Sequence, residues 1–164
     1  MKERERTDDR YNCPSDAVSR YRERSRAVRQ LKNDIEHGDW RGHDGSLWKA
    51  VVLYQGFKFR TSGRGKDHKG AVGFTYKLKV SSRTGEVTDE LVLSTREQGK
   101  TITRSSVELA LSRYLEVQEE RGCVKGPKSA GQIFGASYLY VVFLKFGVIS
   151  SSDLSDLAQE YKEN

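Results

Sequence analysis

The segment from residue 57 to residue 115 constrains the fold most strongly, because apolar and polar side chains alternate along much of it. The alternation is clearest in residues 73–80, where two sets take opposite sides of an extended chain: Phe74, Tyr76, Leu78 and Val80 on one, and Thr75, Lys77 and Lys79 on the other. A period of two is typical of a β-strand with one buried face and one solvent face. We therefore expect a strand at Gly73–Val80.

Two flanking segments, Phe57–Thr61 and Glu90–Arg96, repeat this alternation, and turns that contain glycine separate all three. Successive short strands of this kind predict an antiparallel meander with one face on the core. The solvent face of that sheet would carry five cations: Lys58, Arg60, Lys77, Lys79 and Arg96.

Helical spacing of apolar residues surrounds the predicted sheet. The expected helices are Asp16–His37, Ser46 to about Gly56, a segment capped by Ser105 or Ser106 and ended by Gly122, a buried helix within 133–148, and an acidic helix within 153–162. The predicted class is α+β: a three-stranded antiparallel sheet packed against helices, with a basic N-terminal helix and an acidic C-terminal helix.

A chain of 164 residues predicts one core domain with flanking segments. We expect a disordered tail at 1–14, a basic amphipathic helix and linker at 15–45, the α+β core at 46–149 and the acidic helix at 150–164. Gly135, Ser137, Lys145 and Gly147 interrupt the longest apolar run, so no membrane association is expected. Cys13 and Cys123 show no paired spacing and no signal peptide is evident, which favours a cytoplasmic protein.

The charge distribution favours a polyanionic partner. The net charge is +6, and residues 58–104 hold 11 Lys and Arg against 5 Asp and Glu. Residues 150–164 hold one Lys against four acids. The positive excess thus lies on the predicted sheet and on the glycine-rich loop 62–72 within it, which indicates nucleic acid as the partner. The predicted phosphate-contacting residues are Arg60, Arg64, Lys66, Lys69, Lys77, Lys79 and Lys100.

The order helix, three strands, helix over residues 46–118 resembles two nucleic-acid-binding folds. One is the double-stranded-RNA-binding domain, which carries a Gly-Pro-x-His turn and a Lys-Lys-x-Ala-Lys helix start. Here the first loop lacks Gly-Pro and the helix opens with Thr103-Arg-Ser-Ser106. The other is the integrase-arm type of three-stranded sheet, whose outer face meets the DNA groove. That resemblance implies duplex DNA rather than RNA. A ribbon–helix–helix arrangement within residues 100–146, with Thr101–Thr103 as the ribbon, ranks below both.

Three further patterns define the alternatives. The N-terminal helix has an arginine-rich face that could contact phosphates but also suits a protein partner, as in an inhibitor or adaptor of a nucleic-acid enzyme. This face holds Arg20, Arg22, Arg24, Arg26 and Arg29. One loop could hold a metal-dependent hydrolytic site formed by His37, Asp39, His43 and Asp44, although their spacing is looser than that of known metal sites.

The segment Gly122–Ser129 superficially resembles a phosphate-binding loop, but Pro127 and the preceding helix favour an ordinary turn. We therefore assign no catalytic residue, metal or cofactor, and expect a non-enzymatic protein.

Overall fold

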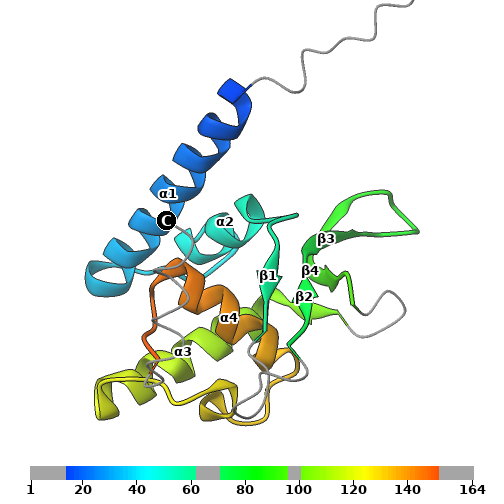
Figure 1. The fold of residues 1–164 in the computed structure, drawn as a ribbon. Helices are drawn as coiled ribbons and strands as arrows, with labels where there is room; N and C mark the ends of the chain where they lie inside the picture. The colour runs from blue at the N-terminus through cyan, green and yellow to red at the C-terminus, as the bar shows by residue number, and fades with distance from the viewer. Residues whose placement is uncertain (1–13, 62–70, 96–100, 152–164) are drawn as a thin grey trace, which may run out of the picture.

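The computed structural model describes residues 14–61, 71–95 and 101–151 (Figure 1). In this part of the chain four α-helices pack against an antiparallel sheet of three strands and a separate sheet of two strands, which confirms the predicted α+β class. The helices are α1 (Pro14–His37), α2 (Ser46–Leu53), α3 (Arg104–Arg121) and α4 (Ala136–Phe146), with a short 3-10 helix, η2 (Pro127–Ala130). The strands are β1 (Phe59–Arg60), β2 (Gly73–Phe74), β3 (Tyr76–Val80), β4 (Val87–Leu93) and β5 (Ile102–Thr103).

The predicted strand neighbours are confirmed, but the strands are divided differently. β1 pairs with β2 and β3 pairs with β4, both antiparallel. The prediction of one continuous strand over 73–80 is wrong, because the chain divides at Thr75 into β2 and β3. The third strand of the three-stranded sheet is β5, which pairs with β4 and lies where the predicted meander had only a connection to the next helix.

One residue of the predicted buried face is on the surface. Tyr76 is 2% exposed and Leu78 is half-buried, whereas Val80 is 55% exposed. A β-bulge between Leu78 and Val80 shifts the register, and Val80 pairs with the exposed Val87 near the turn of the β3–β4 hairpin. The end of the hairpin therefore extends past the core that covers its other half.

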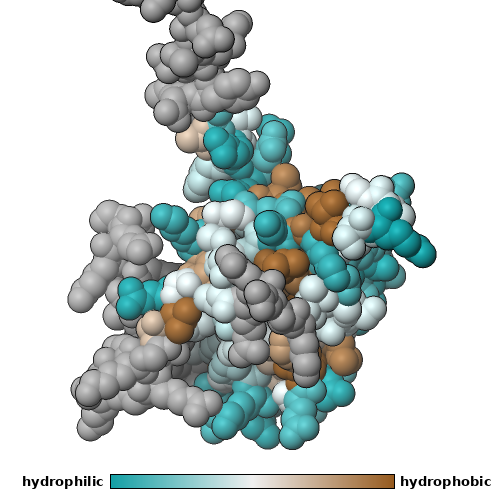
Figure 2. All heavy atoms as spheres, turned by 90° about the vertical axis from the view of Figure 1, so that its right-hand side faces the viewer, coloured by the Kyte–Doolittle hydropathy of each residue, from teal (hydrophilic) through white to brown (hydrophobic). Residues whose placement is uncertain are grey.

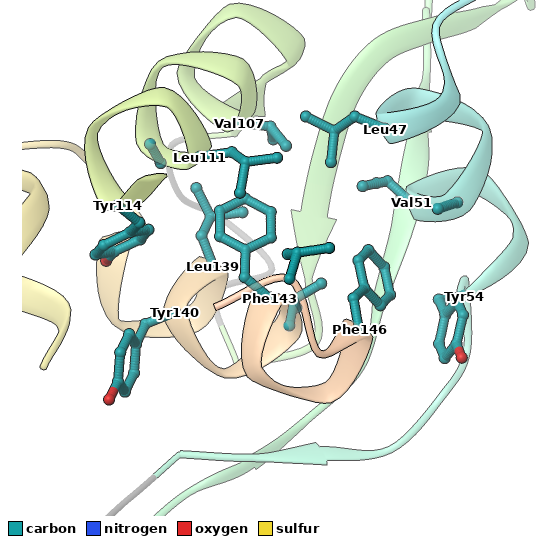
Figure 3. Close-up of a cluster of buried hydrophobic side chains, with 14 of the residues drawn as sticks. Leu47, Val51, Tyr54, Val107, Leu111, Tyr114, Leu139, Tyr140, Phe143 and Phe146 are labelled. Atoms are coloured by element: carbon teal, nitrogen blue, oxygen red, sulfur yellow. The ribbon is translucent and has the colours of Figure 1, made fainter. Parts of the chain in front are cut away.

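The core lies where α2, α3, α4 and the inner face of the strands meet (Figure 3). Phe143 of α4 is fully buried beside Leu111 of α3, and Phe146 points from the same helix toward α2. The Phe146 ring lies 4.8 Å from the Tyr54 ring, between centroids. Four aromatic and aliphatic side chains thus join three helices that are far apart in sequence, and burial of apolar side chains such as these is the main source of folding free energy.

Helix α1 packs on α2 through its second half, while its first turns point away from the body (Figure 1). Leu31 is fully buried and Trp40, just after the helix, is 4% exposed. Val18 and Tyr21, by contrast, are 49% and 72% exposed. These exposures place the end of α1 and the following loop against the core. The predicted division at residue 46 stays a prediction.

The ends of the helices were predicted less accurately than the presence of the helices themselves. Thr103, not Ser105 or Ser106, caps α3: its side chain accepts a hydrogen bond from the Ser106 N–H. Gly122 ends this helix in the left-handed conformation, as expected. Ser46 lies buried inside α2, whose N-cap is Gly45.

The predicted tail and the acidic C-terminal helix lie outside the described residues. Among the helices that the structure describes, none has the length and apolar character needed to span a membrane.

Candidate nucleic-acid interface

The β3–β4 hairpin presents two of the predicted phosphate-contacting lysines. Lys77 and Lys79 are exposed on β3, and they alternate with Tyr76 and Leu78, which face the core. Lys77 pairs across the hairpin with Val92 of β4. The alternation seen in the sequence therefore does separate an apolar inner side of the strand from a lysine-bearing outer side.

Arg60 occupies the equivalent outer side of β1. Phe59 is 4% exposed, and its ring stacks on those of Phe74 and Tyr76 at centroid distances of 5.5 and 5.9 Å. Because successive side chains of a strand point to opposite faces, this stack directs Arg60 to solvent, where it is exposed. The stack beneath β1, β2 and β3 thus holds Arg60 and Lys77 outward on one well-packed scaffold.

The outer surface of the sheet also carries acidic groups. The Lys79 Nζ lies 3.8 Å from a carboxylate oxygen of Glu90, which also accepts a 3.0 Å hydrogen bond from the Thr101 hydroxyl. The expectation of a purely basic face is therefore too simple. A half-exposed pair of this kind is worth about 0–1 kcal/mol, so Lys79 stays available to a stronger anionic partner. Arg60 and Lys77 form no ion pair with any described residue.

Four of the seven predicted contacts, Arg64, Lys66, Lys69 and Lys100, lie outside the described residues, as does Arg96. Lys58 is exposed next to β1. Figure 2 looks onto the side of the molecule where the hairpin lies, and it shows hydrophilic side chains around separate apolar patches.

A polar network that the sequence did not reveal lies behind the sheet, around Asp89 of β4. The Asp89 carboxylate lies 3.0 Å from the His43 Nδ1 and accepts a 3.0 Å hydrogen bond from the Arg104 Nε. Arg104 also donates to Glu108, which accepts a 2.8 Å hydrogen bond from the Gly42 N–H. Together these contacts fasten the 38–45 loop to β4 and to the start of α3.

The network sets the protonation of Asp89. Partial burial opposes ionisation, but the hydrogen bonds and positive charges of His43 and Arg104 outweigh it and lower the pKa of Asp89 below its ordinary range. Arg104 faces two carboxylates, so its charge is compensated within the protein. We therefore leave Arg104 out of the candidate interface.

The loop considered as an alternative metal site makes other contacts. His43 contacts Asp89, 46 residues away, while Asp39 accepts a hydrogen bond from the Arg41 N–H of its own loop. Among the described residues no group of three or more His, Cys, Asp and Glu side chains is arranged to hold a metal ion. No local pattern in the sequence links Asp89 to His43.

A second basic cluster joins α1 to α4 through an aromatic ring. The guanidinium of Arg24 and the Nζ of Lys145 lie 5.5 and 5.2 Å from the centroid of Phe57. Arg24 also lies 5.1 Å from the ring of Tyr54. Cations at such distances are attracted by the negative face of an aromatic ring. The predicted site included no residue of this cluster, because its members are brought together only by the packing of three segments.

No protein-family model, no curated protein and no solved structure matches this chain.

Proposed function

We propose that this protein binds nucleic acid without catalysing a reaction, and that duplex DNA is its ligand. The observation that carries the proposal is the exposure of Arg60 on β1 and Lys77 on β3, each without an ion-pair partner among the described residues. The two strands belong to separate sheets, but their buried rings Phe59 and Tyr76 stack on each other. Such cations gain from phosphate contact because they displace condensed counterions and give up no internal pair. Lys79, with its weak Glu90 contact, is the third member of this surface.

The shape of the β3–β4 hairpin supports duplex DNA over duplex RNA. Two paired antiparallel strands form a ribbon, and the ribbon extends beyond the helices at the right of Figure 1. The B-DNA major groove admits a two-stranded ribbon, whereas the A-form major groove of RNA is too narrow for side chains to read. In this proposal Arg64, Lys66, Lys69 and Lys100 add phosphate contacts from the segments that flank β1, β2 and β5.

The proposal is tested by titrating random-sequence duplex DNA at several salt concentrations and following fluorescence anisotropy. Binding through several phosphates predicts that log K falls linearly with log[salt], with a slope of about −0.9 for each contact. Duplex RNA of the same length serves as the competitor and should displace the DNA poorly. Failure to bind either duplex at low salt would contradict the proposal.

A protein partner is the second candidate, and the exposed apolar side chains of α1 favour it. Val18 and Tyr21 lie three residues apart, so they share one side of the helix in the half that points away from the body. An inhibitor or adaptor of a nucleic-acid enzyme would use such a stripe. Co-purification of one protein after nuclease treatment, lost in a Val18→Ser/Tyr21→Ser variant, would support this candidate instead.

A further inference from the structure

Cations from three separate positions converge where α1 crosses the end of α4. Arg24 and Lys145 approach the same ring, that of Phe57, from different helices. Lys32 is the third cation: a Cβ added to Gly147 would lie 3.0 Å from the Lys32 Nζ, so this ammonium group lies beside the C-terminal end of α4. We call Arg24, Lys32 and Lys145 the basic seam.

The Arg24 side chain is held in place by main-chain carbonyls rather than by acids. Its Nε donates to the Leu53 carbonyl at 2.9 Å and one terminal nitrogen donates to the Gln55 carbonyl at 3.4 Å. A guanidinium has five N–H donors, so further donors remain for a ligand. Because carbonyl groups are neutral, the charge of Arg24 is fixed in position but not cancelled.

Lys32 and Lys145 are exposed, and neither forms an ion pair with a described residue. The partial negative charge at the end of α4 favours cations there, but it amounts to only about half an elementary charge. Within the described ranges, none of the three seam cations is therefore paired with a carboxylate.

The seam is connected to the proposed DNA surface along the chain. Phe57, which two of its cations contact, is followed by the exposed Lys58 and then by β1 with Arg60. The Phe57 and Phe59 rings lie 4.8 Å apart, so the aromatic packing continues from the seam into β1. A polyanion bound to the sheet face and running along this segment would reach the seam.

We infer that the basic seam is a second phosphate-binding site, and that it takes the sugar–phosphate backbone of the same nucleic acid. This inference rests on the proposed function and extends it to residues of α1 and α4. The ligand is a phosphodiester chain because each strand of a duplex carries one charge for about every 3.4 Å of helix axis, so neighbouring phosphates can contact Arg24 and Lys145 together. The seam makes no base contact and adds affinity without sequence preference.

The test compares salt titrations of duplex DNA binding for Lys145→Gln, Lys32→Gln and Lys145→Arg with those for the unchanged protein. Lys125→Gln is the matched control, because Lys125 is an exposed lysine outside the seam and the sheet. Each seam Gln variant should reduce the magnitude of the log–log slope by about one, while Lys145→Arg and Lys125→Gln should leave it unchanged. Circular dichroism confirms that every variant is folded.

Two failures are distinguishable. If the unchanged protein does not bind duplex DNA at low salt, the proposed function and this inference fall together. If it binds, and Lys145→Gln and Lys32→Gln retain the same slope as Lys125→Gln, the seam is not a phosphate site and only this inference is overturned.

Discussion

The hydroxyl of Tyr76 on β3 donates a 2.6 Å hydrogen bond to the main-chain carbonyl of Val51 in α2. Tyr76 is 2% exposed, and burial raises the pKa of its phenol far above the ordinary value, so the group is a neutral donor at every physiological pH. This contact joins the inner side of β3 to helix α2 at Tyr76, the residue that precedes Lys77. The position of the lysine-bearing face therefore depends on a buried tyrosine.

Tyr76→Phe removes that hydrogen bond and should lower the free energy of unfolding by about 1 kcal/mol. The loss is limited because the Val51 carbonyl also accepts a bond from the Tyr54 N–H and is not left unpaired. Urea denaturation measures the change. Tyr21→Phe is the control, since Tyr21 is 72% exposed and should lose nothing measurable. Equal stability of the two variants would show that the Tyr76 bond contributes nothing.

Asp89→Asn should destabilise the protein in a pH-dependent way. The pKa of Asp89 is lowered in the folded state from its ordinary 3.8, because His43 and Arg104 outweigh the opposing effect of burial. A group of this kind stabilises the fold above its unfolded pKa, and the stabilisation is lost as the pH falls through the folded pKa. The variant should therefore be less stable than the parent at pH 7, and the difference should shrink below about pH 4. Urea unfolding of the variant and the parent at pH 7 and below about pH 4 checks this. A stability difference that is the same at both would contradict it.

Gly45→Ala should be strongly destabilising, by more than about 2 kcal/mol, because its Cβ would collide with the carbonyl oxygens of Trp40 and Arg41. Main-chain atoms at that bend cannot rotate away as a side chain would. Gly126→Ala is the matched control: nothing lies within 4 Å of its Cβ, and its backbone is extended, so alanine fits. Thermal melts of the two variants give the comparison. Similar melting temperatures would mean that the Trp40–Gly45 bend is not closely packed.

The sequence predicted the strands because alternation reports directly which side of an extended chain is buried. It could not locate the break at Thr75, since Phe74 and Tyr76 keep the same phase although they pair with Phe59 and Leu93 on different strands. β5 was predicted only as the ribbon of the lower-ranked ribbon–helix–helix arrangement, because two residues, Ile102 and Thr103, are too few to show a period. The four described α-helices were predicted from longer patterns, and only their ends differ from the prediction.

Part of the candidate site could be predicted from the sequence for the same reason. Lys77, Lys79 and Arg60 were found because strand periodicity places them opposite buried neighbours. The Glu90 contact of Lys79 and the His43–Asp89 contact depend on tertiary packing, which no local pattern records. The same holds for Arg24 and Lys145, whose shared ring lies between helices that are distant in sequence.

The most direct test of the central claim is duplex DNA binding by Lys77→Glu/Lys79→Glu. Its control is Lys125→Glu/Lys128→Glu, which makes the same change in net charge on exposed lysines away from the sheet. We expect the unchanged protein to bind with a steep negative salt slope. The sheet variant should lose binding while its circular dichroism spectrum is unchanged, and the control should lose much less. Affinity retained by the folded sheet variant, or lost equally in both, would contradict the claim that the outer face of β3 contacts DNA.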